Sequence, residues 1–106
     1  MTPLQLSLAN LRKDGWLCQK TEHWNPFARV RNDLWGFADA LCLRGKEILA
    51  VQATTTGNIN KRVEKIKASE NYQIVKDAGI RIEVWGWAKR GKRGERKLWQ
   101  LKSIEL

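Results

Sequence analysis

Three polar side chains interrupt two apolar stretches of the chain at a spacing that suits a ligand site. Asp39 lies within the segment FADALCL, and Gln52 and Thr54 lie within LAVQATT. An ionised carboxylate among apolar neighbours is costly unless it meets a cation, a metal or solvent at a cleft. Because residues i and i+2 of a strand point to the same face, we expect Gln52 and Thr54 side by side, with a hairpin bringing them against Asp39. Taken alone, Gln52 is better explained as a buried, hydrogen-bonded amide, so the prediction rests on the group.

Two further acids precede these stretches. Glu22 is expected at the end of a strand, and Asp33 at the entry to the next one. The simpler interpretation of Asp33 is a turn or cap residue, and that of Glu22 is a solvated charge. If both converge with Asp39 and Gln52, three carboxylates and an amide oxygen share one end of the sheet. Oxygen ligands of this kind suit Mg²⁺ or Mn²⁺.

The chain carries a large excess of positive charge. Lys and Arg number 20 and Asp and Glu number 11, so the formal net charge is +9 at pH 7. Such a balance points to a polyanion, most often a nucleic acid, or to an anionic membrane surface. The basic residues expected to contact phosphates are Arg29, Arg31, Lys61, Arg62, Lys89, Arg90, Lys92 and Arg93. For any one of them a solvated surface charge is the simpler explanation, so the prediction depends on their sum.

Six tryptophans are many for a chain of 106 residues. Trp85 and Trp87 share one face of an expected strand, and Trp99 belongs to the next strand. The favoured interpretation is that these three fill the core or cover the sheet; base stacking and a dimer contact are the alternatives. Trp24, close to Glu22 in the sequence, is the better candidate for stacking on a base.

Several classes of protein are disfavoured by what the sequence lacks. No run approaches 18 apolar residues and no signal peptide is visible, so we expect a cytoplasmic protein without a membrane span. Cys18 and Cys42 lack the spacing of metal ligands and are interpreted as reduced core residues. The single histidine, His23, excludes a multi-histidine metal site within one chain. No phosphate-binding loop, dinucleotide-binding glycine motif or GxSxG hydrolase motif occurs.

The apolar periodicity and the turn signals predict one domain, residues 1–106, of the α/β class. We expect a central mixed β-sheet flanked by helices, in the order α-β-β-β-α-β-β. The expected helices are Pro3–Lys13 and a helical region from Gly57 to Ala78 that Ser69 interrupts. The expected strands are Trp16–Trp24, Leu34–Leu43 (an interior strand), Ile48–Thr55 (its hairpin partner), Ile80–Trp87 and Arg96–Ile104, with loops at Asn25–Asn32 and Lys89–Glu95.

The segment GFADALCLRGKEILAVQATT resembles the core of the PD-(D/E)XK nuclease superfamily, in which an Asp on one hairpin strand is followed by (D/E)-x-K on the next. On that pattern Asp39 matches the Asp, Gln52 the second acid and Thr54 the Lys. The chain is similar in size to small Holliday-junction resolvases and phage-type nucleases, and EHWNPFARVRNDLWGFADAL resembles short phage proteins with the same variant. Where the resolvases carry a helix Glu, this chain has Gln5, so Glu22 or Asp33 would stand in for it.

The resemblance implies a divalent-metal-dependent endonuclease that hydrolyses DNA phosphodiester bonds, acting on branched, junction or flap structures, in a prokaryotic or phage-infected cell. Its ligands to Mg²⁺ or Mn²⁺ would be Asp39, Gln52 and the Ala53 carbonyl, completed by Glu22 or Asp33. The missing Lys would be replaced by a cation from elsewhere in the chain: Lys20, Lys61 or Arg62. Nucleases that cut junctions are usually dimers, so the resemblance also implies a homodimer.

Two rival functions remain open on the sequence alone. Gln52 and Thr54 could make the chain a catalytically inert nucleic-acid-binding module on the same fold. A basic ribosome- or RNA-associated protein of another fold is the third hypothesis. Asp39 distinguishes the nuclease from these rivals, because acids at the centre of a surface that only binds phosphate would repel its ligand.

Overall fold

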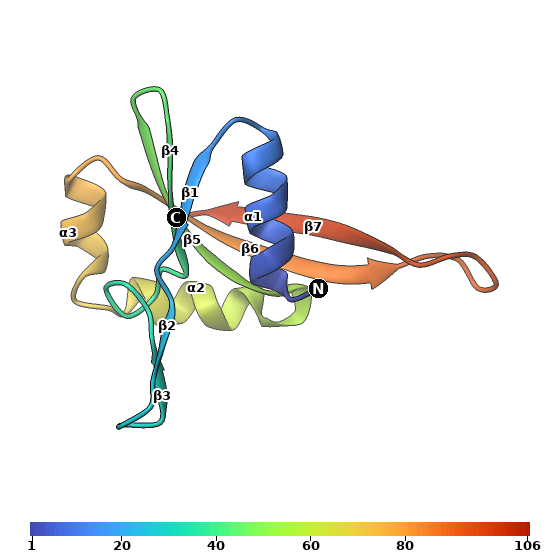
Figure 1. The fold of residues 1–106 in the computed structure, drawn as a ribbon, viewed down its shortest axis with the longest axis horizontal. Helices are drawn as coiled ribbons and strands as arrows, with labels where there is room; N and C mark the ends of the chain where they lie inside the picture. Colours follow the sequence, from blue (N-terminus) through green and yellow to red (C-terminus); the bar gives the residue numbers. More distant parts are fainter.

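The computed structural model describes residues 1–106 as a five-stranded mixed sheet with helices on both faces and a separate two-stranded hairpin (Figure 1). The sheet order is β1-β4-β5-β6-β7, with β5 and β6 parallel and the other neighbours antiparallel. The strands are β1 Leu17–Lys20, β2 His23–Asn25, β3 Val30–Asn32, β4 Ala40–Arg44, β5 Glu47–Thr55, β6 Arg81–Arg90 and β7 Leu98–Glu105. The helices are α1 Pro3–Lys13, α2 Ile59–Lys67 and α3 Tyr72–Asp77, and a 3-10 turn at Thr56–Asn58 precedes α2. The predicted α/β class is confirmed.

Helix α1 covers one face of the sheet and begins where the sequence predicts. The Thr2 side chain accepts a hydrogen bond from the Gln5 backbone N–H, and the Gln5 side chain accepts one from the Thr2 N–H. This reciprocal cap satisfies backbone donors that the first turn of a helix leaves free. Leu8 and Leu11 are buried against the tryptophans of β6. The predicted span of the helix is confirmed.

Helices α2 and α3 cover the opposite face of the sheet. Ile59, Ile66 and Val75 pack there in a second core with residues of β5 and β6. The predicted interruption at Ser69 is confirmed, since the Ser69 hydroxyl accepts a hydrogen bond from the Asn71 N–H just before α3. The strands between two helical layers are therefore buried on both sides, as in other α/β sheets.

The hairpin of β4 and β5 has the predicted pairing, with Ala40 opposite Val51 and Arg44 opposite Glu47. β4 is an interior strand, as expected, but it is shorter than the predicted Leu34–Leu43. The segment from Leu34 to Ala38 instead forms a tight reversal, in which Gly36 and Trp35 both have positive φ angles. Only a glycine adopts such angles without strain, so Gly36 favours the turn over a continued strand.

The predicted strand Trp16–Trp24 is wrong in its second half. The predicted loop Asn25–Asn32 is confirmed at Pro26–Arg29 and wrong at its ends, which belong to strands. β1 ends at Lys20, and β2 and β3 form a hairpin of their own. The Asn25 side chain accepts hydrogen bonds from the N–H groups of Phe27 and Ala28, which builds the turn locally. An asparagine turn between two strands of three residues each leaves a weaker signal in the sequence than an alternating apolar pattern does. The element order is therefore α-β-β-β-β-β-α-α-β-β.

The prediction that the tryptophans of β6 fill the core is confirmed. Trp85 and Trp87 are buried beneath α1, and the Trp87 Nε1 donates to the Ser7 hydroxyl at 2.8 Å. Trp99 lies on β7 opposite Lys89, whose Nζ is 5.1 Å from the centre of the Trp99 ring. The ends of β6 and β7 and the loop of residues 91–97 that joins them form a projecting arm (Figure 1). The strand therefore replaces the first residues of the predicted basic loop.

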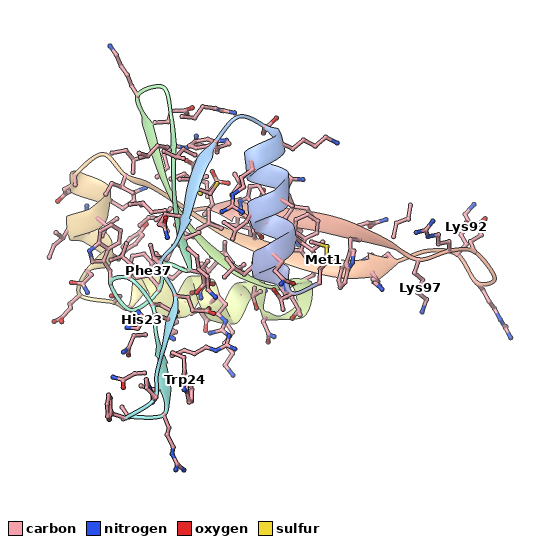
Figure 2. All side chains as sticks on the ribbon, in the orientation of Figure 1. Met1, His23, Trp24, Phe37, Lys92 and Lys97 are labelled. Atoms are coloured by element: carbon pink, nitrogen blue, oxygen red, sulfur yellow. The ribbon has the colours of Figure 1, made fainter.

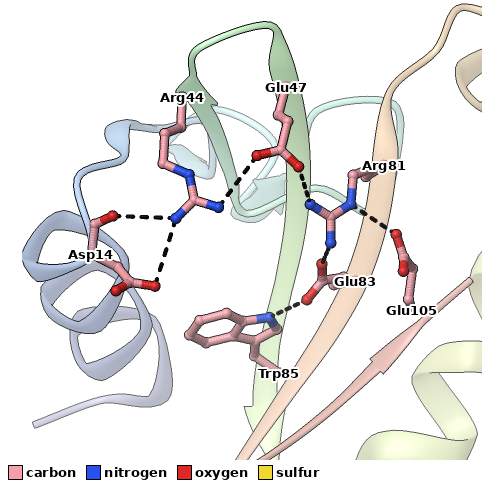
Figure 3. Close-up of polar contacts among 7 residues, drawn as sticks. All are labelled: Asp14, Arg44, Glu47, Arg81, Glu83, Trp85 and Glu105. Carbon is pink, nitrogen blue, oxygen red and sulfur yellow. Dashed lines mark hydrogen bonds and ion pairs between the residues drawn. The ribbon is translucent and has the colours of Figure 1, made fainter.

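A network of ion pairs around Arg81 lies at the end of the sheet where β5 and β6 begin (Figure 3). Arg81 on β6 donates to Glu47 on β5, to Glu83 on its own strand and to Glu105 on β7, at 2.8–2.9 Å. These bonds tie three neighbouring strands together. They also pair carboxylates with cations at the end of the sheet opposite the N-terminal end of β4.

None of the three helices has the length and apolar character that crossing a membrane requires.

Gly86 sets how closely the start of α2 approaches the sheet. A Cβ atom at this position would lie 2.6 Å from Ile59 Cγ1 and 3.0 Å from the backbone Cα of Thr56. We expect Gly86→Ala to lower the free energy of unfolding by about 1–3 kcal/mol, because this overpacking displaces the helix. Chemical denaturation measures the change. Gly57→Ala is the matched control: no atom lies within 4 Å of its Cβ position, so a comparable loss there would contradict the packing argument.

Candidate metal centre

Three carboxylates converge at one end of the sheet. Glu22 lies between β1 and β2, Asp33 follows β3 directly, and Asp39 immediately precedes β4. One ligand oxygen from each lies within 4.8 Å of the others. The backbone brings them together, since the N–H groups of Thr21 and Glu22 both donate to the Asp39 carbonyl. The convergence expected from the sequence is therefore what the structure has.

Asp39 is the buried member of this group, with 4% of its surface exposed. Its Oδ2 accepts a hydrogen bond from the Ala53 N–H at 2.9 Å and one from Gln52 Nε2 at 3.4 Å. Burial raises the pKa of the carboxyl group to about 7. The Ala53 N–H opposes this rise in pKa, and the negative charges of Asp33 and Glu22 add to it. The cluster thus concentrates negative charge that a bound cation would neutralise.

Gln52 adds an oxygen that has no partner inside the protein. Its side chain is buried, and Oε1 makes no hydrogen bond. A buried acceptor without a partner costs about 1–3 kcal/mol. Rotating the amide by half a turn exchanges its oxygen and nitrogen and places Oε1 beside Asp39 Oδ2. Two oxygens so placed suit a shared cation, so the donor set fits Mg²⁺ or Mn²⁺.

Thr54 lies on the same face of β5 as Gln52, as predicted from their spacing. It is buried on the side of the sheet that α2 covers, opposite Gly86 of β6. It does not line the cavity at the carboxylates. A neutral hydroxyl in this place supplies no positive charge, so Thr54 does not replace the lysine of the nuclease motif.

A cavity of about 290 Å³ opens at the cluster. Its walls are the first turns of α1 on one side and the carboxylate end of the sheet on the other. The lining residues are Thr2, Pro3, Leu4, Gln5, Leu8, Lys20, Glu22, Arg31, Asp39 and Ala53. Sequence reasoning singled out most of the polar ones, but it missed Thr2. The cap that starts the helix was the available signal, because it fixes where the first turn must lie.

Gln5 reaches this cavity from α1, at the position where the resolvases carry a glutamate. Its Oε1 accepts a hydrogen bond from the Thr2 N–H, so the side chain is engaged in capping the helix. The acids that stand near Asp39 are Glu22 and Asp33 instead. The structure thus brings together both of the candidates for the third acid.

The cations proposed to replace the missing lysine separate in space. Lys20 lines the cavity together with Asp39. Arg31 lines it too and forms an ion pair with Glu22 at 3.0 Å. Lys61 and Arg62 lie in a different hollow on α2, of about 460 Å³, whose walls are Asn58, Lys61, Arg62 and Lys65. Among the three residues considered from the sequence, Lys20 alone shares the cavity with the acids.

The remaining basic residues lie on two projections of the molecule. Arg29 and Arg31 belong to the β2–β3 hairpin, where Trp24 is 56% exposed. Lys89 and Arg90 end β6, and Lys92 and Arg93 follow in the loop of the β6–β7 arm. Figure 2 shows Lys92 near the end of that arm and Trp24 on the hairpin. The structure therefore places Arg31 at the acids and leaves Lys92 and Arg93 far along the arm.

The raised pKa of Asp39 predicts how stability depends on pH. The folded state holds this proton up to about pH 7, whereas the unfolded chain releases it near 3.8. Stability should therefore fall as pH rises through this window without divalent metal, by on the order of a few kcal/mol. Asp39→Asn should remove most of the fall, whereas the exposed Asp77→Asn, as control, should keep it. Mg²⁺ or Mn²⁺ at pH 8 should raise the Tm of the wild type and of Asp77→Asn but not that of Asp39→Asn. Thermal unfolding measures both effects, the pH dependence in EDTA and the metal effect in metal-containing buffer. Equal pH slopes in all three proteins would contradict it.

Comparison of the chain with models of known protein families, with curated proteins and with solved structures finds no match. A function for this chain must therefore be argued from the geometry and chemistry of the cavity.

Proposed function

We propose that this protein is a divalent-metal-dependent endonuclease that hydrolyses DNA phosphodiester bonds and acts on branched, junction or flap structures. The observation that carries the proposal is the convergence of the Glu22, Asp33 and Asp39 carboxylates. The buried Gln52 amide lies against Asp39, and Glu22 and Asp39 line an open cavity. The resemblance of the surrounding hairpin to the PD-(D/E)XK nucleases supports it, since the same two strands carry Asp39 and Gln52.

The contrast between the positive net charge of the chain and the carboxylates of its cavity supports a metal ion between these acids and the substrate. A formal charge of +9 attracts a polyanion, but the carboxylates in the cavity repel phosphate. A cation held by the acids removes this conflict, and oxygen-rich sites of this kind are typical of Mg²⁺ and Mn²⁺. A surface that served only to bind phosphate would have no use for three acids at its centre.

The proposal assigns the cation to oxygen atoms at this end of the sheet. Asp39, the Gln52 amide with its oxygen turned toward Asp39, and the Ala53 carbonyl would hold it, together with Glu22 or Asp33. When bound, a divalent cation supplies activation of a water molecule and neutralisation of charge on the scissile phosphate.

The cations of the cavity act on the DNA backbone. Lys20 contacts the scissile phosphate group, and Arg31, oriented by Glu22, contacts the neighbouring one. Arg29, Lys61, Arg62 and the cations of the β6–β7 arm bind phosphates farther along the DNA.

A catalytically inert DNA-binding module on the same fold is the alternative. Gln52 favours it, because a neutral amide in place of an acid lowers the affinity for a divalent cation. Thr54 favours it as well, because no positive charge stands at its position in the motif. The two functions share the same basic surface and differ only in whether the carboxylates hold a metal.

The homodimer implied by the resemblance stays a prediction. Helices α2 and α3 do not cover the part of their sheet face that β1 and β4 form. Leu17 and Leu43, paired across these two strands, are 71% and 43% exposed there. With Leu41 these side chains line an apolar hollow of about 200 Å³ at the edge of the sheet. This is the surface on which a second copy would bury apolar area.

Cleavage assays on labelled single-stranded, duplex, flap and four-way-junction DNA test the endonuclease directly. In Mg²⁺ or Mn²⁺ we expect cutting that Asp39→Ala abolishes. Binding should survive or improve in the variant, because the lost carboxylate repels phosphate. Asp39→Asn, which keeps nearly the shape of the carboxyl group, should be inactive as well, and its thermal unfolding checks that loss of activity is not loss of fold.

Each other outcome selects a different function. Undiminished cutting by Asp39→Ala would contradict the assigned site. An absence of cutting in either metal, with binding that weakens steeply as salt rises, would favour the inert module. Preference for RNA together with indifference to Mn²⁺ would favour an RNA-associated protein.

Lys20 and Lys61 separate the roles of cations inside and outside the cavity. We expect Lys20→Ala to lower the cleavage rate by about ten- to a hundredfold with little change in binding, since its charge acts at the scissile group. Lys61→Ala should leave the cleavage rate at saturating protein unchanged and weaken binding, lowering the salt slope by about one. Single-turnover kinetics and binding titrations measure both. The reverse pattern would assign the catalytic cation to α2.

A further inference from the structure

The β2–β3 hairpin stands apart from the body of the protein. Its two strands pair only with each other and form a sheet of their own. Figures 1 and 2 show it projecting away from the main sheet, with Trp24 on it. A projection that adds nothing to the core must be explained by what it contacts outside the molecule.

The tip of this hairpin is apolar and fully exposed. Phe27 is 98% exposed, and Trp24 and Val30 below it are 56% and 46% exposed. A large aromatic side chain that stays in water contributes none of the folding free energy that its burial would supply. Clustered exposure of this kind marks a contact surface rather than a chance surface residue.

The tip is also held in place by the chain itself. The Asn25 side chain accepts hydrogen bonds from the N–H groups of Phe27 and Ala28 at 3.0 and 3.2 Å. Pro26 has a fixed φ angle, and Arg29 adopts a left-handed φ of 54°. Phe27 is therefore presented by an ordered turn, which lowers the entropy cost of inserting its ring into a partner.

The charge of the hairpin identifies the partner as an anion. Arg29 and Arg31 are its charged residues, and no acid lies between His23 and Asn32. An apolar ring flanked by guanidinium groups suits either a nucleic acid or an anionic lipid surface. The root of the hairpin favours the nucleic acid, because Glu22 and Asp33 of the candidate metal centre directly flank its two strands.

We propose that the β2–β3 hairpin is a wedge that inserts Phe27 into an interrupted base stack, so that the protein selects DNA with unpaired or unstacked bases. Apolar side chains that enter base steps are a known means of opening nucleic acids, and the cost is least where bases are already unpaired. Trp24 lies on the same face as Arg31, its cross-strand partner, and stacks on a second base nearer the cavity. This inference rests on the proposed function for the choice of DNA as the partner and for the position of the cut.

The length of the hairpin sets the distance between the wedge and the metal centre. Phe27 is five residues from Glu22, and an extended strand rises about 3.3 Å per residue, which gives roughly 16 Å. One strand of DNA advances about 3.4 Å per nucleotide. The disturbed base should therefore lie within about five nucleotides of the phosphodiester bond at the acids.

Binding measured in EDTA tests the wedge without requiring any cleavage. The ligands are a four-way junction, a flap and a fully paired duplex of equal length, each with 2-aminopurine at the branch or at the matching duplex position. We expect the wild type to bind the branched forms more tightly and to raise their fluorescence. Phe27→Ala should weaken branched binding about tenfold and duplex binding less than about threefold, and it should abolish the fluorescence change.

Two further variants distinguish stacking from general surface effects. Phe27→Trp keeps an aromatic ring and should bind branched DNA within about twofold of the wild type. Ile74→Ala removes another exposed apolar side chain, on α3, and should behave as the wild type on all ligands. Where cutting is observed, its position relative to the fluorescent base checks the five-nucleotide reach.

Three results would overturn the wedge. The first is an equal affinity of the wild type for branched and paired DNA. The second is a Phe27→Ala variant that keeps the wild-type preference for branched DNA. The third is binding to vesicles of phosphatidylcholine and phosphatidylserine that Phe27→Ala loses, which would assign the tip to a membrane surface. None of these results depends on nuclease activity, so a failed cleavage assay leaves the test of the wedge intact.

Discussion

The backbone and side chain of Asp39 join segments that are distant in the sequence. Its N–H donates to Val51, its carbonyl accepts from Thr21 and Glu22, and its buried carboxylate accepts from the Ala53 N–H. These bonds hold the end of β1, the root of the β2–β3 hairpin and the end of β5 around one charged group. The same carboxylate is costly to ionise in this place, as its raised pKa indicates. The position of Asp39 thus explains both the geometry of the cavity and why a cation there would be stabilising.

Charge is distributed unevenly over the molecule. At one end of the sheet Arg81 and Arg44 neutralise the acids around them, including Glu47, which both contact. At the other end the cluster of carboxylates is offset by a single short ion pair, Arg31 with Glu22. Lys20 and Arg31 line the cavity, and further cations lie outside it on α2 and on the β6–β7 arm. A polyanion is therefore attracted to the edges of the molecule, while the centre of the basic region stays acidic.

The two projections differ in their position relative to the cluster of carboxylates. None of the basic residues of the β6–β7 arm lines the cavity at the carboxylates. The β2–β3 hairpin grows directly out of the cluster, since Glu22 and Asp33 flank it. Arg31 of this hairpin and Glu22 at its root both line the cavity. In the proposed metal centre Gln52 would bind the cation least strongly, because its amide is neutral.

The sequence by itself determined the α/β class, the first helix, the break at Ser69 and the hairpin that opposes Asp39 to Gln52. These features follow from local patterns: a helix cap, apolar periodicity and the two-residue repeat of a strand. Only the tertiary structure decided that Leu34–Ala38 turns back, that Asn25–Asn32 belongs to a projecting hairpin, and that Lys20 rather than Lys61 shares the cavity with Asp39. Short strands and side-chain convergence depend on contacts between distant segments, whose free energy is gained only when the whole sheet has formed.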